Sequence, residues 1–142
     1  MTRSVVTEKV VTEPLRPIEL HQVDRLALKR KLDNALSSVT KKLDKTIAIV
    51  GNKFPNEACE GGKWQPTDNV EWTTSFWPGQ LWLAWEMTGD DKYRRAAERY
   101  LPSFAERLDK RIETATHDLG FLYTLSCVNA WRNSAREPEA SS

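Results

Sequence analysis

Apolar residues recur at three- and four-residue steps through the first third of the chain, with Lys and Asp residues between them. This spacing predicts an amphipathic helix over residues 18–50, and Gly51 supplies a stop signal. The apolar stripe consists of Leu26, Leu32, Leu36, Val39, Leu43 and Ile47. Residues 1–17 lack the periodicity and contain two prolines, so we expect a flexible N-terminal arm there.

Prolines, glycines, Asn and Asp interrupt every periodicity in residues 52–71. No strand pattern of convincing length is visible there, so this segment is predicted to be a loop. A loop of such length is usually functional or disordered in a compact domain.

Three further helices are predicted in the second half of the chain. One begins near Trp77 and ends at Gly89, and it is apolar nearly all round, which indicates burial on most sides. A second follows Asp90 and is interrupted at Pro102, because proline lacks a backbone donor. A third covers residues 119–132 and is again mostly apolar.

Charge-rich helices therefore alternate with apolar ones, which predicts stacked αα-hairpins and an all-α fold. We expect residues 18–133 to form one domain of about two hairpins, and residues 134–142 to form a frayed tail.

The charge balance narrows the function classes. The net charge is +1, from 21 basic and 20 acidic residues, so no general attraction to nucleic acid or to anionic membranes is expected. The start of the chain lacks a signal-peptide pattern and no apolar run is long enough to span a bilayer, which predicts a soluble cytoplasmic protein.

The two cysteines have no metal-ligand spacing, so no metal site is expected. Cys127 lies among apolar residues and is interpreted as a buried free thiol, with a disulfide to Cys59 as the alternative.

Two loop-to-helix junctions carry the candidate chemistry, and they span residues 71–79 and 116–121. Each opens an apolar helix, so in an array of hairpins both would lie at the same end. That end would bring together Trp72, Trp77, His117 and Asp118.

Such a group suits a sugar site, because tryptophan faces stack on sugar C–H groups and a carboxylate handles protons. Aromatic walls disfavour the charged form of a carboxylate, which suits a general acid. Each residue also has a structural alternative. Asp118 precedes an apolar helix and could be an N-cap, His117 could be a hydrogen-bonded structural residue, and the tryptophans could belong to the core.

The segment Trp72-Thr-Thr-Ser-Phe-Trp-Pro-Gly-Gln-Leu-Trp-Leu-Ala-Trp-Glu86, followed by Thr88-Gly-Asp90, resembles the unsaturated glucuronyl hydrolases of glycoside hydrolase family 88. So does His117-Asp-Leu-Gly-Phe-Leu-Tyr123, at a matching spacing. The resemblance covers about residues 20–132 and corresponds to the N-terminal portion of the family. The related unsaturated rhamnogalacturonyl hydrolases share the architecture and remain an alternative.

The resemblance implies an (α/α)6 barrel of which this chain would be an incomplete part. It implies action on oligosaccharides left by polysaccharide lyases, which carry a 4,5-unsaturated uronic acid at the non-reducing end. An acid protonates C4, water adds at C5, and the hemiketal opens with loss of the glycosidic bond. No metal or other cofactor is implied.

Under the resemblance, Asp118 matches the first of the family's two key aspartates and is the catalytic candidate. His117 and Trp72 match substrate contacts, and Trp77 is the further candidate for substrate binding. The second aspartate of the family lies downstream of these motifs. We therefore expect this chain alone to be weakly active or inactive.

The alternative function is a non-catalytic helical module that binds sugar or assembles with other chains. Apolar inner helices without neighbours would favour self-association.

Overall fold

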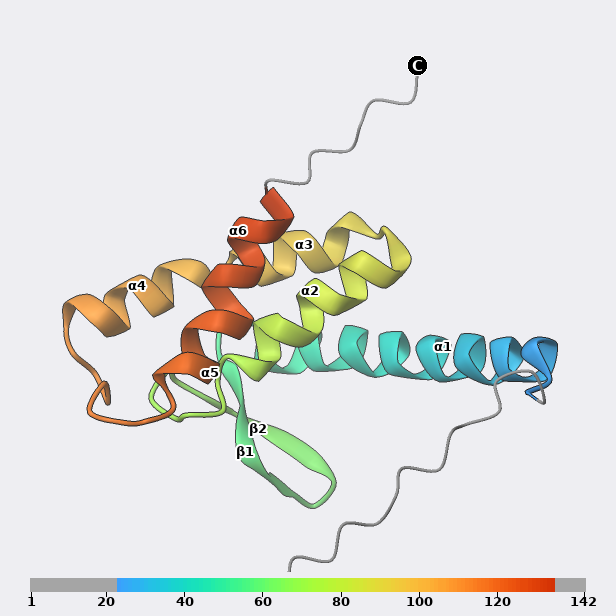
Figure 1. Cartoon of the computed structure of the whole chain (residues 1–142). Coiled ribbons are helices and arrows are strands. Elements are labelled where there is room, and N and C mark those ends of the chain that lie inside the picture. The colour runs from blue at the N-terminus through green and yellow to red at the C-terminus, as the bar shows by residue number, and fades with distance from the viewer. Residues whose placement is uncertain (1–22, 135–142) are drawn as a thin grey trace, which may run out of the picture. The chain divides into compact units, whose positions relative to one another are not determined.

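The computed structural model describes residues 23–134, which divide into two compact units between Asn34 and Ala35. The expected arm, the start of the first expected helix at residues 18–22 and the tail beyond Ser134 lie outside the described residues. The helices are α1 (Arg25–Val50), α2 (Phe76–Thr88), α3 (Asp91–Glu98), α4 (Leu101–Asp109), α5 (Leu119–Tyr123) and α6 (Asn129–Ser134). A π-helical segment η2 (Thr124–Val128) and two strands, β1 (Phe54–Glu60) and β2 (Lys63–Thr67), complete the elements (Figure 1).

The first predicted helix is present as α1, and it ends at Val50, directly before Gly51. In the part of α1 that belongs to the second unit, Leu43, Thr46 and Val50 are buried and Ile47 packs against the core. Val39 is exposed, so the buried stripe is narrower than the sequence pattern indicates.

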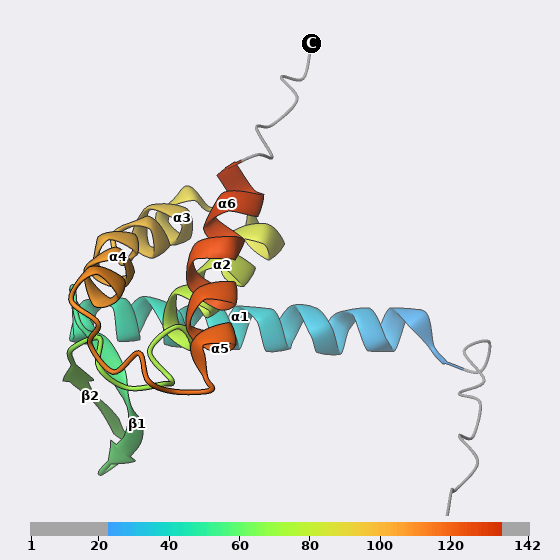
Figure 2. The same cartoon turned by 60° about the vertical axis from the view of Figure 1, so that its left-hand side comes forward.

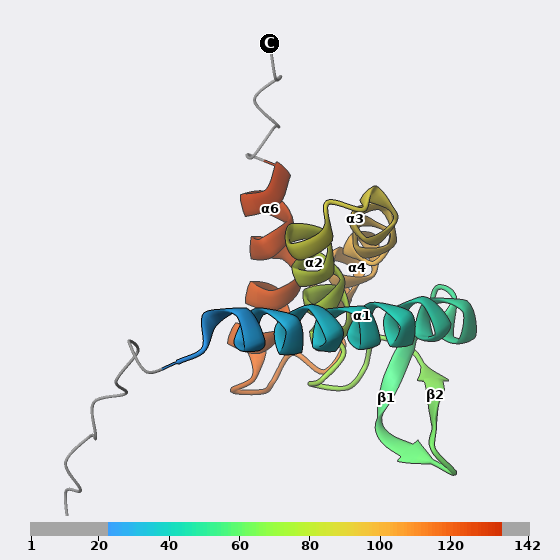
Figure 3. The ribbon, with the colours of Figure 1, turned by 90° about the vertical axis from the view of Figure 1, so that its right-hand side faces the viewer.

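The predicted loop at residues 52–71 is wrong for most of its length, because β1 and β2 pair there as an antiparallel hairpin (Figure 3). Glu60 pairs with Lys63 across a turn at Gly61 and Gly62, which have φ values of 55° and 77°. Those positive φ angles favour glycine, and a two-glycine turn is the hairpin signal that the proline-rich flanks obscured. The hairpin is anchored by Phe54, a buried residue at the start of β1.

The ends of α2, α3 and α4 follow the local signals. Gly89 has φ 69° and its N–H donates to the Trp85 carbonyl, as a left-handed C-cap requires. The Asp90 side chain accepts from the Lys92 N–H and caps α3. The predicted break occurs where Pro102 enters the first turn of α4.

The last predicted helix is present as α5, η2 and α6 in succession, so its middle is π-helical rather than α-helical (Figure 2). The Ser126 hydroxyl within η2 donates to the Leu122 carbonyl. This part of the chain packs against α2, where a Cβ built on Gly79 would lie 3.2 Å from the Leu125 Cβ. A side chain at this position would therefore fit only if Leu125 gave way by a few tenths of an ångström.

One apolar cluster lies among α2, α3, α4, the last helix and the second half of α1. Its buried members are Leu43, Val50, Phe54, Trp77, Leu81, Trp82, Ala84, Tyr93, Ala96, Ala97, Tyr100, Phe104, Leu122 and Ala130. The charge-rich α3 thus contributes one buried face, and α2 contributes most of its length, as its composition indicates.

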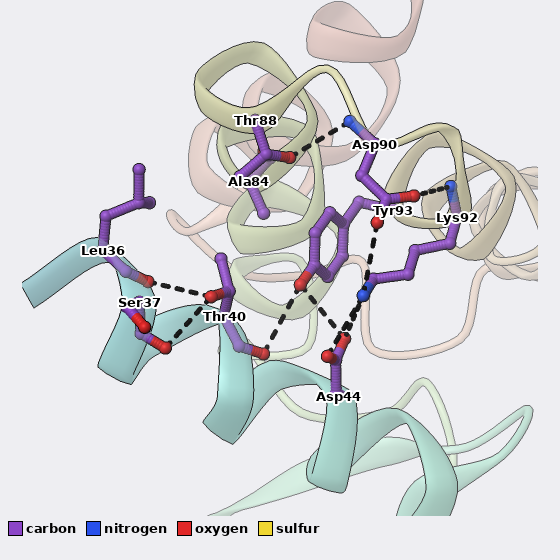
Figure 4. Close-up of polar contacts among 9 residues, drawn as sticks. All are labelled: Leu36, Ser37, Thr40, Asp44, Ala84, Thr88, Asp90, Lys92 and Tyr93. Atoms are coloured by element: carbon purple, nitrogen blue, oxygen red, sulfur yellow. Dashed lines mark hydrogen bonds and ion pairs between the residues drawn. The ribbon is translucent and has the colours of Figure 1, made fainter. Parts of the chain in front are cut away.

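A polar contact joins α1 to α3 at the edge of this core (Figure 4). The Tyr93 hydroxyl donates to Asp44 Oδ1 at 3.0 Å, and Lys92 Nζ lies 3.1 Å from the same carboxylate. Burial raises the pKa of Tyr93, so its hydroxyl is a donor at neutral pH. The ring is buried in the core while the hydroxyl fixes the position of α1.

We expect Tyr93→Phe to lower the free energy of unfolding by about 1 kcal/mol, because a partly buried hydrogen bond is lost while the ring still packs. Urea unfolding followed by far-UV circular dichroism measures the change. Lys92→Gln is the matched control and should have a smaller effect, since the Lys92 side chain is exposed and its ion pair is screened by solvent. Equal losses in both variants would contradict a special role for the tyrosine hydroxyl.

Candidate functional site

The two predicted junctions lie side by side. Ser75, which is fully buried in the middle of the first junction, donates its hydroxyl to the Phe121 carbonyl at 2.9 Å. The rings of Phe76 and Phe121 stack with their centroids 6.1 Å apart and an interplanar angle of 27°. The expectation that both junctions share one end of the helices is therefore confirmed.

An exposed row of three aromatic rings runs across this contact. Trp72 meets Phe76 edge to face at 6.2 Å, and Phe76 stacks on Phe121. The three residues are 44%, 39% and 52% exposed, in that order. We call Trp72, Phe76 and Phe121 the aromatic row. Its rings offer apolar area to a ligand such as a sugar ring.

Sequence reasoning identified Trp72 but missed Phe76 and Phe121. Both phenylalanines lie inside the two quoted motifs, so the signal was present. Their stacking depends on how two segments 45 residues apart approach, which spacing along the chain does not reveal.

Asp118 directly precedes α5, the helix that carries Phe121 of the aromatic row. Its side chain is 16% exposed, and it accepts a hydrogen bond from Thr116 Oγ1 at 2.9 Å. The Asp118 backbone N–H donates in turn to Thr116 Oγ1 at 3.2 Å. Although Asp118 occupies the N-cap position, its side chain makes no capping hydrogen bond, so the capping alternative is wrong for the carboxylate.

His117 is the most accessible of the candidates, with a side chain that is 94% exposed. Its Nε2 lies 3.4 Å from Asp118 Oδ1. An imidazole so exposed does not serve as a buried structural link, and it can reach a ligand beside Asp118.

Trp77 is placed differently from Trp72. It is 4% exposed and belongs to the core cluster, as does Trp82. An edge of Trp77 lines a cavity of about 430 Å³ between α1, the hairpin and the start of α2. Its role as a sugar contact stays a prediction, and its burial favours the packing alternative.

The polypeptide before the first junction is held by side-chain hydrogen bonds. Thr74 Oγ1 donates to Asn69 Oδ1 at 2.6 Å, and Asn69 Nδ2 donates to Ser103 Oγ on α4 at 2.8 Å. Thr74 is buried, so these contacts fix the backbone directly behind Trp72.

Two negative findings concern residues 23–134. In this part of the chain no three His, Cys, Asp or Glu side chains gather in a group that could hold a metal ion. Over the same residues, no helix combines the length and apolar character needed to cross a membrane. Cys59 and Cys127 are free thiols, the first exposed and the second half-buried.

Comparisons with known proteins point to one family, although no family model matches the chain. The chain is 34% identical over 125 residues to an unsaturated chondroitin disaccharide hydrolase of Streptococcus pneumoniae, covering 88% of this chain and 32% of that protein. It is 46% identical over 81 residues to an unsaturated glucuronyl hydrolase of Bacillus sp. strain GL1, covering 57% of this chain and 22% of that protein.

The crystal structure of unsaturated glucuronyl hydrolase from Streptococcus agalactiae matches with a TM-score of 0.71 and 38% identity, over 74% of this chain and 26% of that chain. A mutant of that protein has been solved in complex with dGlcA-GalNAc6S.

The chain is homologous to one portion of the unsaturated glucuronyl hydrolases. Its helices are αα-hairpins of the α/α-barrel fold of those enzymes, so the expected fold class is confirmed. The chain spans 32% of the length of the S. pneumoniae relative.

We expect Ser75→Ala to lower the free energy of unfolding by about 1 kcal/mol, because the Phe121 carbonyl loses the Ser75 hydroxyl and keeps the Thr124 N–H as a donor. Urea unfolding measures this loss, and nuclear Overhauser contacts between the Phe76 and Phe121 rings should weaken. The control is Ser134→Ala, an exposed serine that also donates to a backbone carbonyl. Unchanged ring contacts in Ser75→Ala would show that the junctions do not need this bridge.

Proposed function

We propose that this chain contributes the first carboxylate and an aromatic sugar platform to a glycoside hydrolase of the unsaturated glucuronyl hydrolase type. The observation that carries the proposal is the Ser75–Phe121 bridge, because it sets the aromatic row beside Asp118. Exposed aromatic faces next to a largely buried carboxylate suit a ligand with an apolar ring face and a bond that must be protonated.

The substrate class proposed is an oligosaccharide with a 4,5-unsaturated uronic acid at its non-reducing end. The names of the relatives support it, since they act on unsaturated chondroitin disaccharides or are glucuronyl hydrolases. The S. agalactiae complex with dGlcA-GalNAc6S supports the same class.

Three of the four candidates receive a role in this proposal. Asp118 is the catalytic carboxylate, and Thr116 holds it by a hydrogen bond. Trp72 stacks on the sugar, and the exposed His117 imidazole contacts the ligand beside Asp118. Phe76 and Phe121 continue the platform from Trp72 toward α5.

The reaction proposed is hydration of the vinyl ether of the unsaturated uronate. A proton is added at C4 and water adds at C5, which gives a hemiketal. The hemiketal opens, the glycosidic bond is lost, and the sugar that it joined is released. Asp118 stands where a carboxyl group could assist in this proton transfer.

A chimera tests the catalytic role. The matching segment of the S. agalactiae enzyme is replaced by the aligned segment of this chain, and turnover of an unsaturated chondroitin disaccharide is followed by the loss of vinyl-ether absorbance. Asp118→Asn should lower the rate by roughly 10²- to 10⁴-fold, the range for lost acid–base catalysis.

Asp109→Asn is the control for that experiment, since Asp109 is an exposed aspartate at the end of α4. It should turn over substrate as the unmodified chimera does. An Asp118→Asn chimera that keeps the unmodified rate would exclude the catalytic role.

Self-association through the apolar helices is the second candidate function. Besides Phe76 of the aromatic row, four large apolar side chains are exposed on α2, η2 and α6: Leu83, Met87, Val128 and Trp131. The three elements that carry them pack against each other within one unit. Exposed apolar patches of this kind favour association with a second copy.

Sedimentation velocity tests this candidate on the chain itself. We expect the wild-type chain to sediment as a concentration-dependent oligomer, and the double variant Leu83→Lys/Trp131→Lys to sediment as a monomer, because charges oppose apolar burial. Leu108→Lys, at an exposed leucine on α4, is the control and should still associate. A wild-type monomer at all concentrations would exclude the candidate.

A further inference from the structure

One buried side chain joins the two loops that carry the candidate site. Arg107 lies near the end of α4 and is 1% exposed. Its guanidinium donates to six oxygens. Nε donates to the Ile112 carbonyl (3.0 Å), and Nη2 donates to the Val70 carbonyl (3.0 Å) and the Glu113 carbonyl (3.3 Å). Nη1 donates to Asn69 Oδ1 (3.0 Å), the Glu71 carbonyl (2.9 Å) and Thr74 Oγ1 (3.4 Å).

These acceptors belong to two separate segments of the chain. Residues 69–74 carry Trp72 and lead into α2, whereas residues 112–113 lead to His117, Asp118 and α5. One planar group therefore sets the distance between the loop that bears the platform and the loop that leads to the carboxylate. Lysine could not do this, because its single amine lacks the five donors and the fixed fork of a guanidinium.

The placement of Arg107 is energetically demanding. Burial lowers the pKa of Arg107, and the carboxylates of Glu113 and Glu71 offset that effect only in part. All six acceptors are uncharged oxygens, so the hydrogen bonds replace water without pairing the charge. An apolar residue of similar volume would fill the space at less cost in desolvation. The arrangement therefore indicates a role beyond packing.

The second loop is strained where Arg107 holds it. Arg111 and Glu113 have φ values of 53° and 46°, which residues other than glycine rarely adopt. Such conformations persist only where surrounding contacts impose them. Arg107 binds the carbonyls of Ile112 and Glu113, and the Ile112 N–H donates back to the Arg107 carbonyl at 2.9 Å.

We propose that Arg107 is the positioning residue of the candidate site. It touches no substrate and acts by holding Trp72 and Asp118 at a fixed separation. The inference rests on the proposed function for its ligand, but its effect on the two loops can be observed without any ligand.

The experiment uses the 142-residue chain with 5-fluorotryptophan at its six tryptophans, the Trp72 resonance being assigned with Trp72→Phe. Arg107→Lys keeps the charge and loses the fork. Three quantities are measured, all well below the melting temperature. They are the ¹⁹F resonance of Trp72, the hydrogen exchange rate of the Ile112 amide, and the affinity for an unsaturated chondroitin disaccharide, which is followed by tryptophan fluorescence. Arg95→Lys is the control, an exposed arginine that pairs with Asp91.

We expect Arg107→Lys to keep its helical circular dichroism while the Trp72 resonance shifts or broadens and Ile112 exchanges faster. Affinity should fall roughly tenfold or more, because small misplacement of binding groups is costly. Arg95→Lys should match the wild type in all three measurements. Should Arg107→Lys fail to fold, Thr74→Val removes one acceptor and should give smaller changes in the same direction.

Two results would overturn the inference. One is a Trp72 resonance and an Ile112 exchange rate that do not change; the other is loosened loops with unchanged affinity, which would make Arg107 merely structural. A wild-type chain that does not bind the disaccharide would instead overturn the proposed function. The ¹⁹F and exchange measurements would then decide alone whether Arg107 holds the two loops.

Discussion

The close approach of α2 to the last helix is the constraint on which the rest of the site depends. At Gly79 the helices come so near that an added Cβ would lie 3.2 Å from the Leu125 Cβ. This contact sets the start of α2 beside the start of α5, and Ser75 can then reach the Phe121 carbonyl. The aromatic row exists because those two starts meet, so it follows from how two apolar helices pack.

Two kinds of contact support the fold and the candidate site. The core cluster and the hydrogen bond between Tyr93 and Asp44 hold α3 against the second half of α1. Arg107 and Asn69 hold the loops by hydrogen bonds rather than by apolar contact. Apolar packing thus places the helices, and polar contacts place the segments between them.

Much of this could be predicted from local signals. Gly89, Asp90 and Pro102 act on the backbone next to them. The end of α2 and the starts of α3 and α4 can therefore be predicted from the sequence. The pairing of the two junctions was also predictable, since it follows from the alternation of apolar and charge-rich helices.

Other features depend on contacts between distant residues, and for these the local sequence pattern either pointed to another structure or gave no signal. Pro55 and Pro66 face each other across the hairpin, so two residues that usually break strands lie in paired ones. Nothing in its sequence surroundings distinguishes Arg107, a residue of a charge-rich helix, from its exposed neighbours. Trp72 and Trp77 belong to one motif, yet the first is exposed and the second is in the core.

The π-helical segment between α5 and α6 changes the direction in which the residues before it face relative to those after it. A π turn holds about one residue more than an α turn, and each residue advances an α-helix by about 100°. Without the extra residue, Phe121 and Asp118 would be rotated by about that angle relative to Ala130 and Asn133, which are buried in α6. The segment thus sets the direction of Asp118 and Phe121 at the start of this continuous helix while its last turns stay in register with the core.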